Sequence, residues 1–290
     1  MSFDKGILRK YAQLEEPEKL PPSVYFTHTE HTITIFDAYP KATFHFLVLP
    51  RVKDKTGPWS AANLISLKKF FNSNQASVED ARILMQRLKG DAETVCEMIV
   101  EEMRSRYGFV WKLYMGFHAV QSMDHVHLHI FSEDLCARAL KTKKHYNSFH
   151  PKLGFFLHLD DVLSWFDKGN AESYIKSMTK LEESSYEKKL KEPLECFHCA
   201  KELRNIPTLK EHLKQHFDKI AEKGKATEAN GKRGCNERRT EEKTKGSKDH
   251  DLKQETEMAQ KAVSPDSAGE VAQEVEDRDY DAPRKRLKLA

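Results

Sequence analysis

Seven consecutive residues, 125–131, alternate imidazole and apolar side chains in the order His-Val-His-Leu-His-Ile-Phe. A β-strand places successive side chains on opposite faces of its sheet. A strand here would put His125, His127 and His129 on one face and the apolar residues on the other, which a core must cover. The segment therefore predicts a half-buried strand that carries a row of three imidazoles.

Three interpretations of this row are open. Solvated histidines on an amphipathic strand would explain the alternation without any chemistry. A zinc site would need a further ligand or a helper carboxylate, and no such residue stands at an obvious spacing. Chemistry on a phosphate is favoured, because an imidazole nitrogen is a good nucleophile near neutral pH and leaves readily once phosphorylated. A covalent histidine–nucleotide intermediate is then expected.

The segments around the histidines predict an α+β fold, in which helices cover an antiparallel sheet. Alternating or short apolar runs indicate further strands at residues 24–26, 32–36, 46–50 and 109–115. Helical spacing covers residues 3–20, 60–72, 78–106 and 160–166, with Gly90 as a candidate break in the third segment. Residues 176–192 have the composition of a charged connector.

A second module is indicated by two cysteines and two histidines with the spacing Cys196-x₂-Cys199-x₁₂-His212-x₃-His216. The two histidines fall one turn apart on a helix expected over residues 208–217, so the four ligands can converge as a tetrahedron. This spacing predicts a C2H2 zinc finger with one structural Zn²⁺, which replaces the core that so small a module lacks. The finger could serve stability alone. Its basic residues favour contact with a phosphate backbone, and these are Lys201, Arg204, Lys210 and Lys214.

Composition limits the classes of function. The formal net charge of the 290 residues is only +3, so a nucleic-acid interface has to rest on local patches. No run of about eighteen apolar residues occurs, and no membrane association is expected. The five cysteines do not have the pattern of a disulfide framework. A soluble intracellular protein is the simplest expectation.

The chain is expected to divide into four regions. They are an N-terminal helix at 1–20, a catalytic domain at 21–180, the finger at 190–218 and a disordered tail at 220–290. The tail ends in the basic segment 283–289, Pro-Arg-Lys-Arg-Leu-Lys-Leu, which is compatible with nuclear import. A nuclear location is the resulting expectation.

Two sequence blocks resemble the histidine-triad superfamily. Residues 125–131 match its signature of three histidines alternating with apolar residues, and residues 37–50 resemble its nucleotide-pocket strand. Within the superfamily, residues 40–41, 116–119 and 140–149 resemble the aprataxin family of DNA 5′-adenylate hydrolases. The resemblance spans residues 24–217. No phosphopeptide-binding forkhead-associated domain is expected, because the residues given before the catalytic region could not form one.

The resemblance implies a role for each matched residue. His127 would attack the phosphorus of AMP and form a histidine–AMP intermediate that water then cleaves. His129 and Ser122 would hold the phosphate, and Asp37 would bind the ribose hydroxyls. The remaining implied roles are His118 as acid or electrostatic stabiliser at the departing DNA phosphate, His45 and His125 as members of the histidine network around the nucleotide, and Lys41 and Lys141 as contacts to the DNA end.

Simpler explanations stand beside several of these roles. His45 and His118 could be structural histidines, Asp37 could only form a turn, and Lys141 could belong to a solvated face. An apolar wedge that stacks on a DNA terminus is expected near the N-terminal helix, and Phe3 is the candidate. Phe3 could equally belong to the core.

The resulting expectation is a nuclear hydrolase that acts on 5′-adenylated DNA left by abortive ligation, largely independent of base sequence. Its products would be AMP and a 5′-phosphorylated end. A general hydrolase of dinucleoside polyphosphates or nucleoside phosphoramidates would need the same histidines, but the finger would then have no evident purpose. A non-catalytic DNA-binding adaptor with a decayed pocket is the second alternative, and the intact histidine row argues against it.

Overall fold

The computed structural model describes residues 4–53, 55–180 and 182–245, with side chains described as far as residue 227. Residues 4–226 belong to the first of two compact units, which contains every strand described below. The second unit is represented by the continuation of the last helix from residue 227 to Lys245. Fold and site are therefore both features of the first unit.

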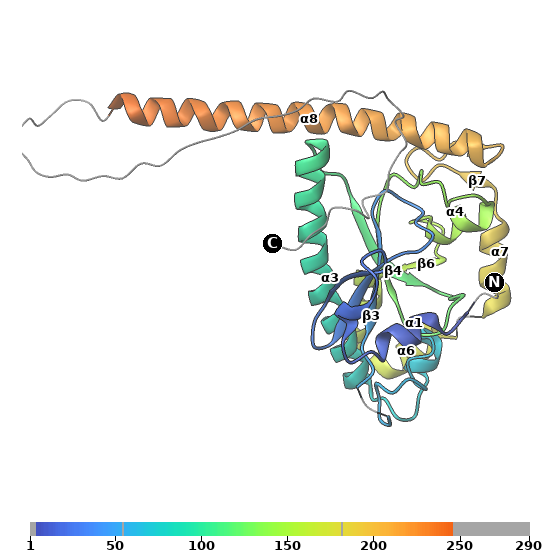
Figure 1. Ribbon diagram of the computed structural model, residues 1–290. Helices are drawn as coiled ribbons and strands as arrows, with labels where there is room; N and C mark the ends of the chain where they lie inside the picture. Colours follow the sequence, from blue (N-terminus) through green and yellow to red (C-terminus); the bar gives the residue numbers. More distant parts are fainter. Residues whose placement is uncertain (1–3, 54, 181, 246–290) are drawn as a thin grey trace, which may run out of the picture. The chain divides into compact units, whose positions relative to one another are not determined.

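A six-stranded antiparallel sheet forms the centre of this unit (Figure 1). The strands, in the order in which they pair, are β1 (Tyr25–His28), β2 (Thr32–Phe36), β3 (His45–Pro50), β5 (Leu128–Ser132), β4 (Leu113–His118) and β6 (Phe156–His158). The strands predicted at 24–26, 32–36 and 46–50 are confirmed as β1, β2 and β3, which pair as consecutive antiparallel neighbours in a meander. Strand β5 then inserts between β3 and β4, with His129 opposite Leu47 and Gly116.

Eight α-helices lie in the described part of the chain. They are α1 (Ile7–Ala12), α2 (Leu67–Phe71), α3 (Val78–Tyr107), α4 (Lys143–Phe149), α5 (Leu159–Ser164), α6 (Ala171–Met178), α7 (Glu183–Lys191) and α8 (Ile206–Lys245), with 3₁₀ turns at Pro17–Lys19 and Trp165–Asp167. None of these described helices is long and apolar enough to span a membrane. The expected connector at 176–192 is largely helical, because it contains the end of α6 and all of α7.

Helix α3 differs from the prediction, because it passes through Gly90 without a break. It begins at a capping box in which the Ser77 and Asp80 side chains each accept a backbone N–H, and it ends at Gly108 in the left-handed conformation. A continuous row of buried apolar residues from Ala81 to Met103 offsets the cost of one glycine. The helix expected at 60–72 is reduced to α2, because residues 60–65 form turns.

Helices cover both faces of the sheet. Alternation along β3 directs Phe46 and Val48 into a core shared with α3, whereas Leu47 and Leu49 pack with Leu8 of α1 on the opposite face. Figure 1 shows α3 running along the sheet. Because His129 pairs with Leu47, it projects on the α1 face. The candidate histidines therefore lie on the face that α3 does not cover.

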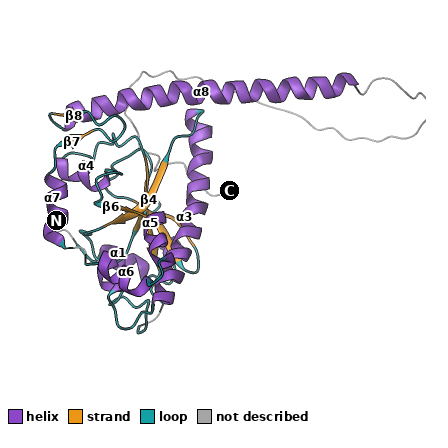
Figure 2. Ribbon diagram, turned by 180° about the vertical axis from the view of Figure 1, so that it is seen from behind, coloured by secondary structure: helices purple, strands orange, loops and turns teal. Residues whose placement is uncertain are grey.

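A two-stranded sheet, β7 (Leu194–Glu195) with β8 (Glu202–Leu203), leads into α8 and forms the small module predicted as a finger. It packs next to α4 (Figure 2). Leu209 and Leu213 of α8 share a buried cluster with Phe131 of β5 and Tyr146 of α4. Helix α8 extends to Lys245, through the first part of the region expected as a disordered tail. Residues 246–290, including the basic segment 283–289, lie outside the described residues.

Candidate active site and metal centre

The histidine strand is shorter than predicted, because β5 begins at Leu128 and leaves His125 and His127 in the segment that leads to it. His125 has a φ of 95°, which places its backbone in the left-handed region. Its N–H donates to the carbonyl of Ile65 at 2.9 Å, and its Nε2 lies 2.7 Å from the carbonyl oxygen of Pro50. The prediction of three imidazoles in one regular strand was therefore wrong at His125. This buried residue lies at a corner of the chain that is fixed by hydrogen bonds to the carbonyls of Ile65 and Pro50.

His127 has a defined tautomer. Its Nδ1 lies 2.7 Å from the carbonyl oxygen of His125, and because a carbonyl only accepts, Nδ1 must carry the proton. The lone pair is then on Nε2. Burial lowers the pKa of His127, although the bond to the His125 carbonyl and the charge of Asp37 oppose this shift. The imidazole is neutral at neutral pH and presents a nucleophilic nitrogen.

His45 and His129 form a directed pair across β3 and β5. The backbone N–H of Lys41 donates to Nδ1 of His45 at 3.1 Å, so a neutral His45 carries its proton on Nε2. That Nε2 lies 3.1 Å from Nδ1 of His129 and donates to it. His129 must then carry its own proton on Nε2, which is buried and has no partner among the described residues. Such an N–H is suited to donate to a phosphate oxygen.

Both imidazoles of this pair are neutral. Burial lowers the pKa of His45 to about 4, against the opposing charge of Asp37, whose carboxylate lies 3.5 Å from His45 Nε2. Burial also holds the pKa of His129 well below its usual range. For Asp37, burial is the largest single effect and favours the protonated form, but His45 and Lys41 outweigh it and the pKa is lowered. Asp37 is therefore an anion beside neutral histidines.

The ligand atoms of Asp37, His45 and His129 lie within 4.8 Å of one another, a spacing that could also hold a metal ion. The two nitrogens that face each other already share a hydrogen bond. A metal would need the lone pair of both. The chain of hydrogen bonds from the Lys41 backbone through His45 to His129 therefore favours phosphate chemistry over metal binding at this cluster.

His118 lies at the end of β4, with its ring centroid 4.4 Å from that of His129. Burial holds its pKa well below the usual range, and its Nε2 is a second buried nitrogen without a partner among the described residues. Its neighbour Gly116 is required by packing, because a Cβ there would lie 2.3 Å from the carbonyl oxygen of Leu157. Strands β4 and β6 therefore approach each other closely at Gly116.

The remaining predicted residues lie at different depths. Lys41 is 8% exposed, and its Nζ donates to the carbonyl of Tyr39. Burial lowers the pKa of Lys41, opposed by the charge of Asp37. Lys141 is exposed and its backbone N–H donates to Nδ1 of His145 at 3.2 Å. Ser122 is exposed on the segment between β4 and β5, and Phe3 lies outside the described residues.

Two supporting residues were missed by sequence reasoning. Gln121 donates through Nε2 to the carbonyls of Ile65, Met123 and His125, at 2.9, 2.7 and 3.1 Å, and so holds the segment that carries His127. Phe149 of α4 packs its ring against the histidine cluster. Neither position has a periodicity or spacing that distinguishes it, although Phe149 lies in the block 140–149 that carried the family resemblance.

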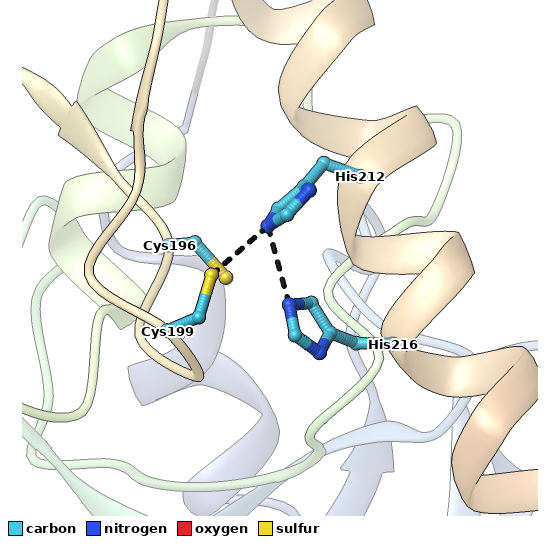
Figure 3. Close-up of side chains that lie close together, drawn as sticks. All are labelled: Cys196, Cys199, His212 and His216. Carbon is cyan, nitrogen blue, oxygen red and sulfur yellow. Dashed lines mark hydrogen bonds between the residues drawn. The ribbon is translucent and has the colours of Figure 1, made fainter.

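The second cluster combines Cys196, Cys199, His212 and His216, whose sulfur and nitrogen atoms all lie within 4.8 Å of one another (Figure 3). Nε2 of His212 is 3.2 Å from both Sγ of Cys199 and Nε2 of His216. The two histidines lie one turn apart on α8, and the cysteines flank the turn between β7 and β8, as predicted. Two thiolates and two imidazoles that converge in this way fit one tetrahedral Zn²⁺.

Two family models match the chain in succession. Residues 5–145 match the family described as "Scavenger mRNA decapping enzyme C-term binding", and residues 152–219 match the "C2HE / C2H2 / C2HC zinc-binding finger". The first match ends within α4 and the second includes all four cluster ligands. The two matches therefore separate the histidine site from the metal centre along the sequence.

Similar proteins match more than two thirds of this chain. The aprataxin of Ciona intestinalis is 32% identical over 202 residues, which are 70% of this chain and 43% of that protein. The aprataxin of Gallus gallus is 32% identical over 198 residues, which are 68% of this chain and 52% of that protein. The chain thus spans about half the length of these relatives.

The structure titled "Hnt3 in complex with DNA and guanosine" has the same fold, with a TM-score of 0.54 and 21% identity over 76% of this chain and 98% of that one. The fold and the histidine site thus define a histidine-triad protein with a zinc finger of the C2H2 type. Within this class, the chain belongs to the aprataxin family.

Proposed function

We propose that this protein is a hydrolase that removes AMP from adenylated 5′ ends of DNA. The observation that carries the proposal is the state of His127, a buried neutral imidazole whose Nδ1 proton is held by the His125 carbonyl at 2.7 Å. This arrangement leaves Nε2 as a nucleophile that needs no general base. The homology to aprataxins and the DNA-bound title of the similar fold support DNA as the carrier of the AMP group.

In the first step, Nε2 of His127 attacks the AMP phosphorus. A nitrogen–phosphorus bond forms, the bond from that phosphorus to the bridging oxygen breaks, and the electron pair leaves with the 5′-phosphate of the DNA. The leaving group is already an anion and needs no proton from a strong acid. His118, whose buried Nε2 has no other partner among the described residues, would stabilise its charge.

In the second step, water attacks the same phosphorus and the nitrogen–phosphorus bond breaks. AMP leaves, the electron pair returns to Nε2 of His127, and the proton of the water passes to solvent. The Nε2–H of His129 would donate to the non-bridging phosphate oxygens in both steps, and Lys41 would supply positive charge. Asp37 would accept hydrogen bonds from the ribose hydroxyls, and Ser122 would close on the phosphate.

DNA would be gripped through its phosphates and not read by sequence. Lys141 is exposed just before α4, while Lys201, Arg204 and Lys214 are on the finger module. Such cations neutralise backbone phosphates without distinguishing bases. Phe3 remains the proposed wedge at the DNA end. The basic segment 283–289 supports a nuclear location, where such DNA ends arise.

Zn²⁺ is the proposed cofactor, held by Cys196, Cys199, His212 and His216. When bound, the ion supplies a cross-link between the β7–β8 turn and α8, and no chemistry on the nucleotide. Lys210 of the finger donates through Nζ to the carbonyl of Ala137, outside the finger, at 2.9 Å. The finger thus has a structural role next to the site.

The test is turnover of a 5′-adenylated nicked duplex by the wild type, by His127→Ala and by His31→Ala, an exposed histidine that serves as the matched control. We expect His127→Ala to lower kcat at least about a thousandfold and His31→Ala to leave it unchanged. A rapid alkaline quench, which preserves a nitrogen–phosphorus bond, should trap AMP on the wild type and on His31→Ala but not on His127→Ala. Turnover confined to free diadenosine tetraphosphate would instead indicate a small-molecule hydrolase, and full activity of His127→Ala would exclude the mechanism.

A further inference from the structure

Helix α4 contacts the zinc finger with one side chain. Tyr146 is fully buried; its hydroxyl donates to the carbonyl of Glu195 at 2.8 Å and accepts from the backbone N–H of Phe197 at 3.3 Å. These two residues flank the metal ligand Cys196. The phenol therefore holds the backbone on both sides of that ligand.

The same helix contacts the histidine cluster with another side chain. The ring of Phe149 lies 5.0 Å from that of His45, 5.1 Å from that of His129 and 4.5 Å from that of His118, centroid to centroid. The interplanar angles of 85°, 89° and 63° are those of edge contacts. Phe149 thus fills the space against which three of the five site histidines are packed.

The helix between these contacts is firmly held. Thr142 caps its N-terminus by accepting from the backbone N–H of His145 at 3.2 Å. The buried side chain of Asn147 donates to the carbonyls of Lys189, Leu190 and Glu192, at 3.4, 3.3 and 2.9 Å. It thereby satisfies the end of α7, from which the chain enters the finger. Tyr146 and Phe149 are one helical turn apart and must move together.

We propose that Tyr146 and Phe149 are positioning residues that couple the Cys196 segment of the finger to His45, His118 and His129. The finger then sets the geometry of the catalytic histidines as well as contacting DNA. The inference rests on the proposed function for its kinetic consequences. Its structural consequence, a change in the imidazoles when the finger contact is cut, is independent of any substrate.

The kinetic experiment uses the full chain with Tyr146→Phe, Phe149→Leu and Tyr174→Phe. Tyr174 lies on α6 and gives the same chemical change away from the link. We expect Tyr146→Phe to lower kcat on the adenylated nick about threefold to tenfold, which is the size of one net hydrogen bond, with KM within about twofold of the wild type. Phe149→Leu should lower kcat further, and the double variant should fall short of the product of the two effects. A higher KM with unchanged kcat would overturn the proposal, because the finger contact would then serve DNA binding alone.

The second readout is the imidazole ¹⁵N spectrum of each variant without substrate, together with its bound zinc and melting temperature. Tyr146→Phe should shift the His45 and His129 signals while zinc content stays at one ion per chain, and Tyr174→Phe should leave them unchanged. Identical signals in Tyr146→Phe and the wild type would overturn the coupling. If Phe149→Leu fails to fold, the spectrum of Tyr146→Phe alone decides whether the coupling exists, because this variant removes only one oxygen atom and should still fold. A wild type that releases no AMP defeats the proposed function, whereas the imidazole signals still test the link.

Discussion

Nε2 of His45 lies 3.1 Å from Nδ1 of His129, and the bond joins two neighbouring strands, β3 and β5. The backbone N–H of Lys41 fixes the direction of this bond, because it donates to Nδ1 of His45 and leaves the His45 proton on Nε2. The proton of His129 is therefore held on the nitrogen that has no protein partner among the described residues. The tautomer of His45 thus determines which nitrogen of His129 can donate a hydrogen bond.

Substitution of His45 tests this relay. In His45→Ala, His129 is free to adopt the other tautomer and Asp37 loses the partner 3.5 Å away. Leaving buried polar groups unpaired costs about 1–3 kcal/mol, so we expect kcat to fall about tenfold to a hundredfold in steady-state turnover of the adenylated nick. Unchanged kcat in a folded His45→Ala protein would show that His129 does not depend on this bond.

The pH dependence of activity follows from the lowered pKa of His127, which burial causes. In the proposed mechanism the neutral imidazole is the nucleophile, so kcat/KM should be flat near neutral pH and fall only when His127 takes up a proton. We expect the midpoint of the acid limb below the usual histidine pKa of about 6.5. A midpoint above that value, measured on the nicked substrate, would mean that His127 is not held neutral by burial.

Stability should also depend on pH, because burial lowers the pKa of both His45 and His125 to about 4. The unfolded chain binds protons at these residues below about pH 6.5, whereas the folded chain binds them only near pH 4. The free energy of unfolding contributed by these groups should be fully present above that window and decrease as the pH falls through it. Urea titrations of the wild type and His125→Gln across the window should give a shallower slope for the variant, which keeps the zinc finger intact. Equal slopes would contradict the assignment.

Gly116 should not tolerate a side chain. A Cβ there would meet the Leu157 carbonyl oxygen at 2.3 Å and the Phe156 ring at 2.6 Å, so β6 would have to move. We expect Gly116→Ala to lower the free energy of unfolding by about 3 kcal/mol or more. Gly90→Ala is the matched control, since nothing lies within 4 Å of its Cβ and alanine should stabilise α3 by about 0.5–1 kcal/mol. Equal effects of the two substitutions would contradict the β4–β6 packing.

Removal of zinc should destabilise more than the finger. Leu209, Leu213 and Phe197 of the finger share one buried cluster with Tyr146 and Phe131. We expect chelation, or Cys199→Ser, to lower the melting temperature by about 5 °C or more. Cys96→Ser is the control, because Cys96 lies on α3. A finger that loses its metal without any change in the main melting transition would show that the two parts are energetically separate.

The elements with a strict local pattern could be predicted from the sequence. Residues 32–36 show period-two alternation and residues 46–49 form a short apolar run, and either pattern indicates a strand. The four metal ligands have a spacing that can be recognised without knowledge of the fold. The break considered at Gly90 is absent, because the cost of one glycine in a helix is small compared with the stabilisation from burying the apolar row from Ala81 to Met103.

The rest depended on tertiary contacts. The left-handed backbone of His125 results from hydrogen bonds to Ile65 and Pro50, which lie far away in sequence. Phe149 acquires its place only when α4 packs under the histidines, and Gln121 when residues 64–65 pass beside it. Contacts between segments that are distant in sequence produce no periodic pattern in a single sequence. The residues that carry the chemistry of the site could therefore be predicted, but the residues that hold them in position could not.

The corner at His125 has a consequence for mutational tolerance. Many enzymes orient a catalytic imidazole with a carboxylate, and one substitution can abolish that orientation. Here the orienting atom for His127 belongs to the main chain, which every amino acid at position 125 would still supply. No substitution at position 125 can therefore remove the hydrogen-bond partner of His127 directly. Substitutions that displace the backbone at His125, such as those at Gln121, should misalign His127 instead.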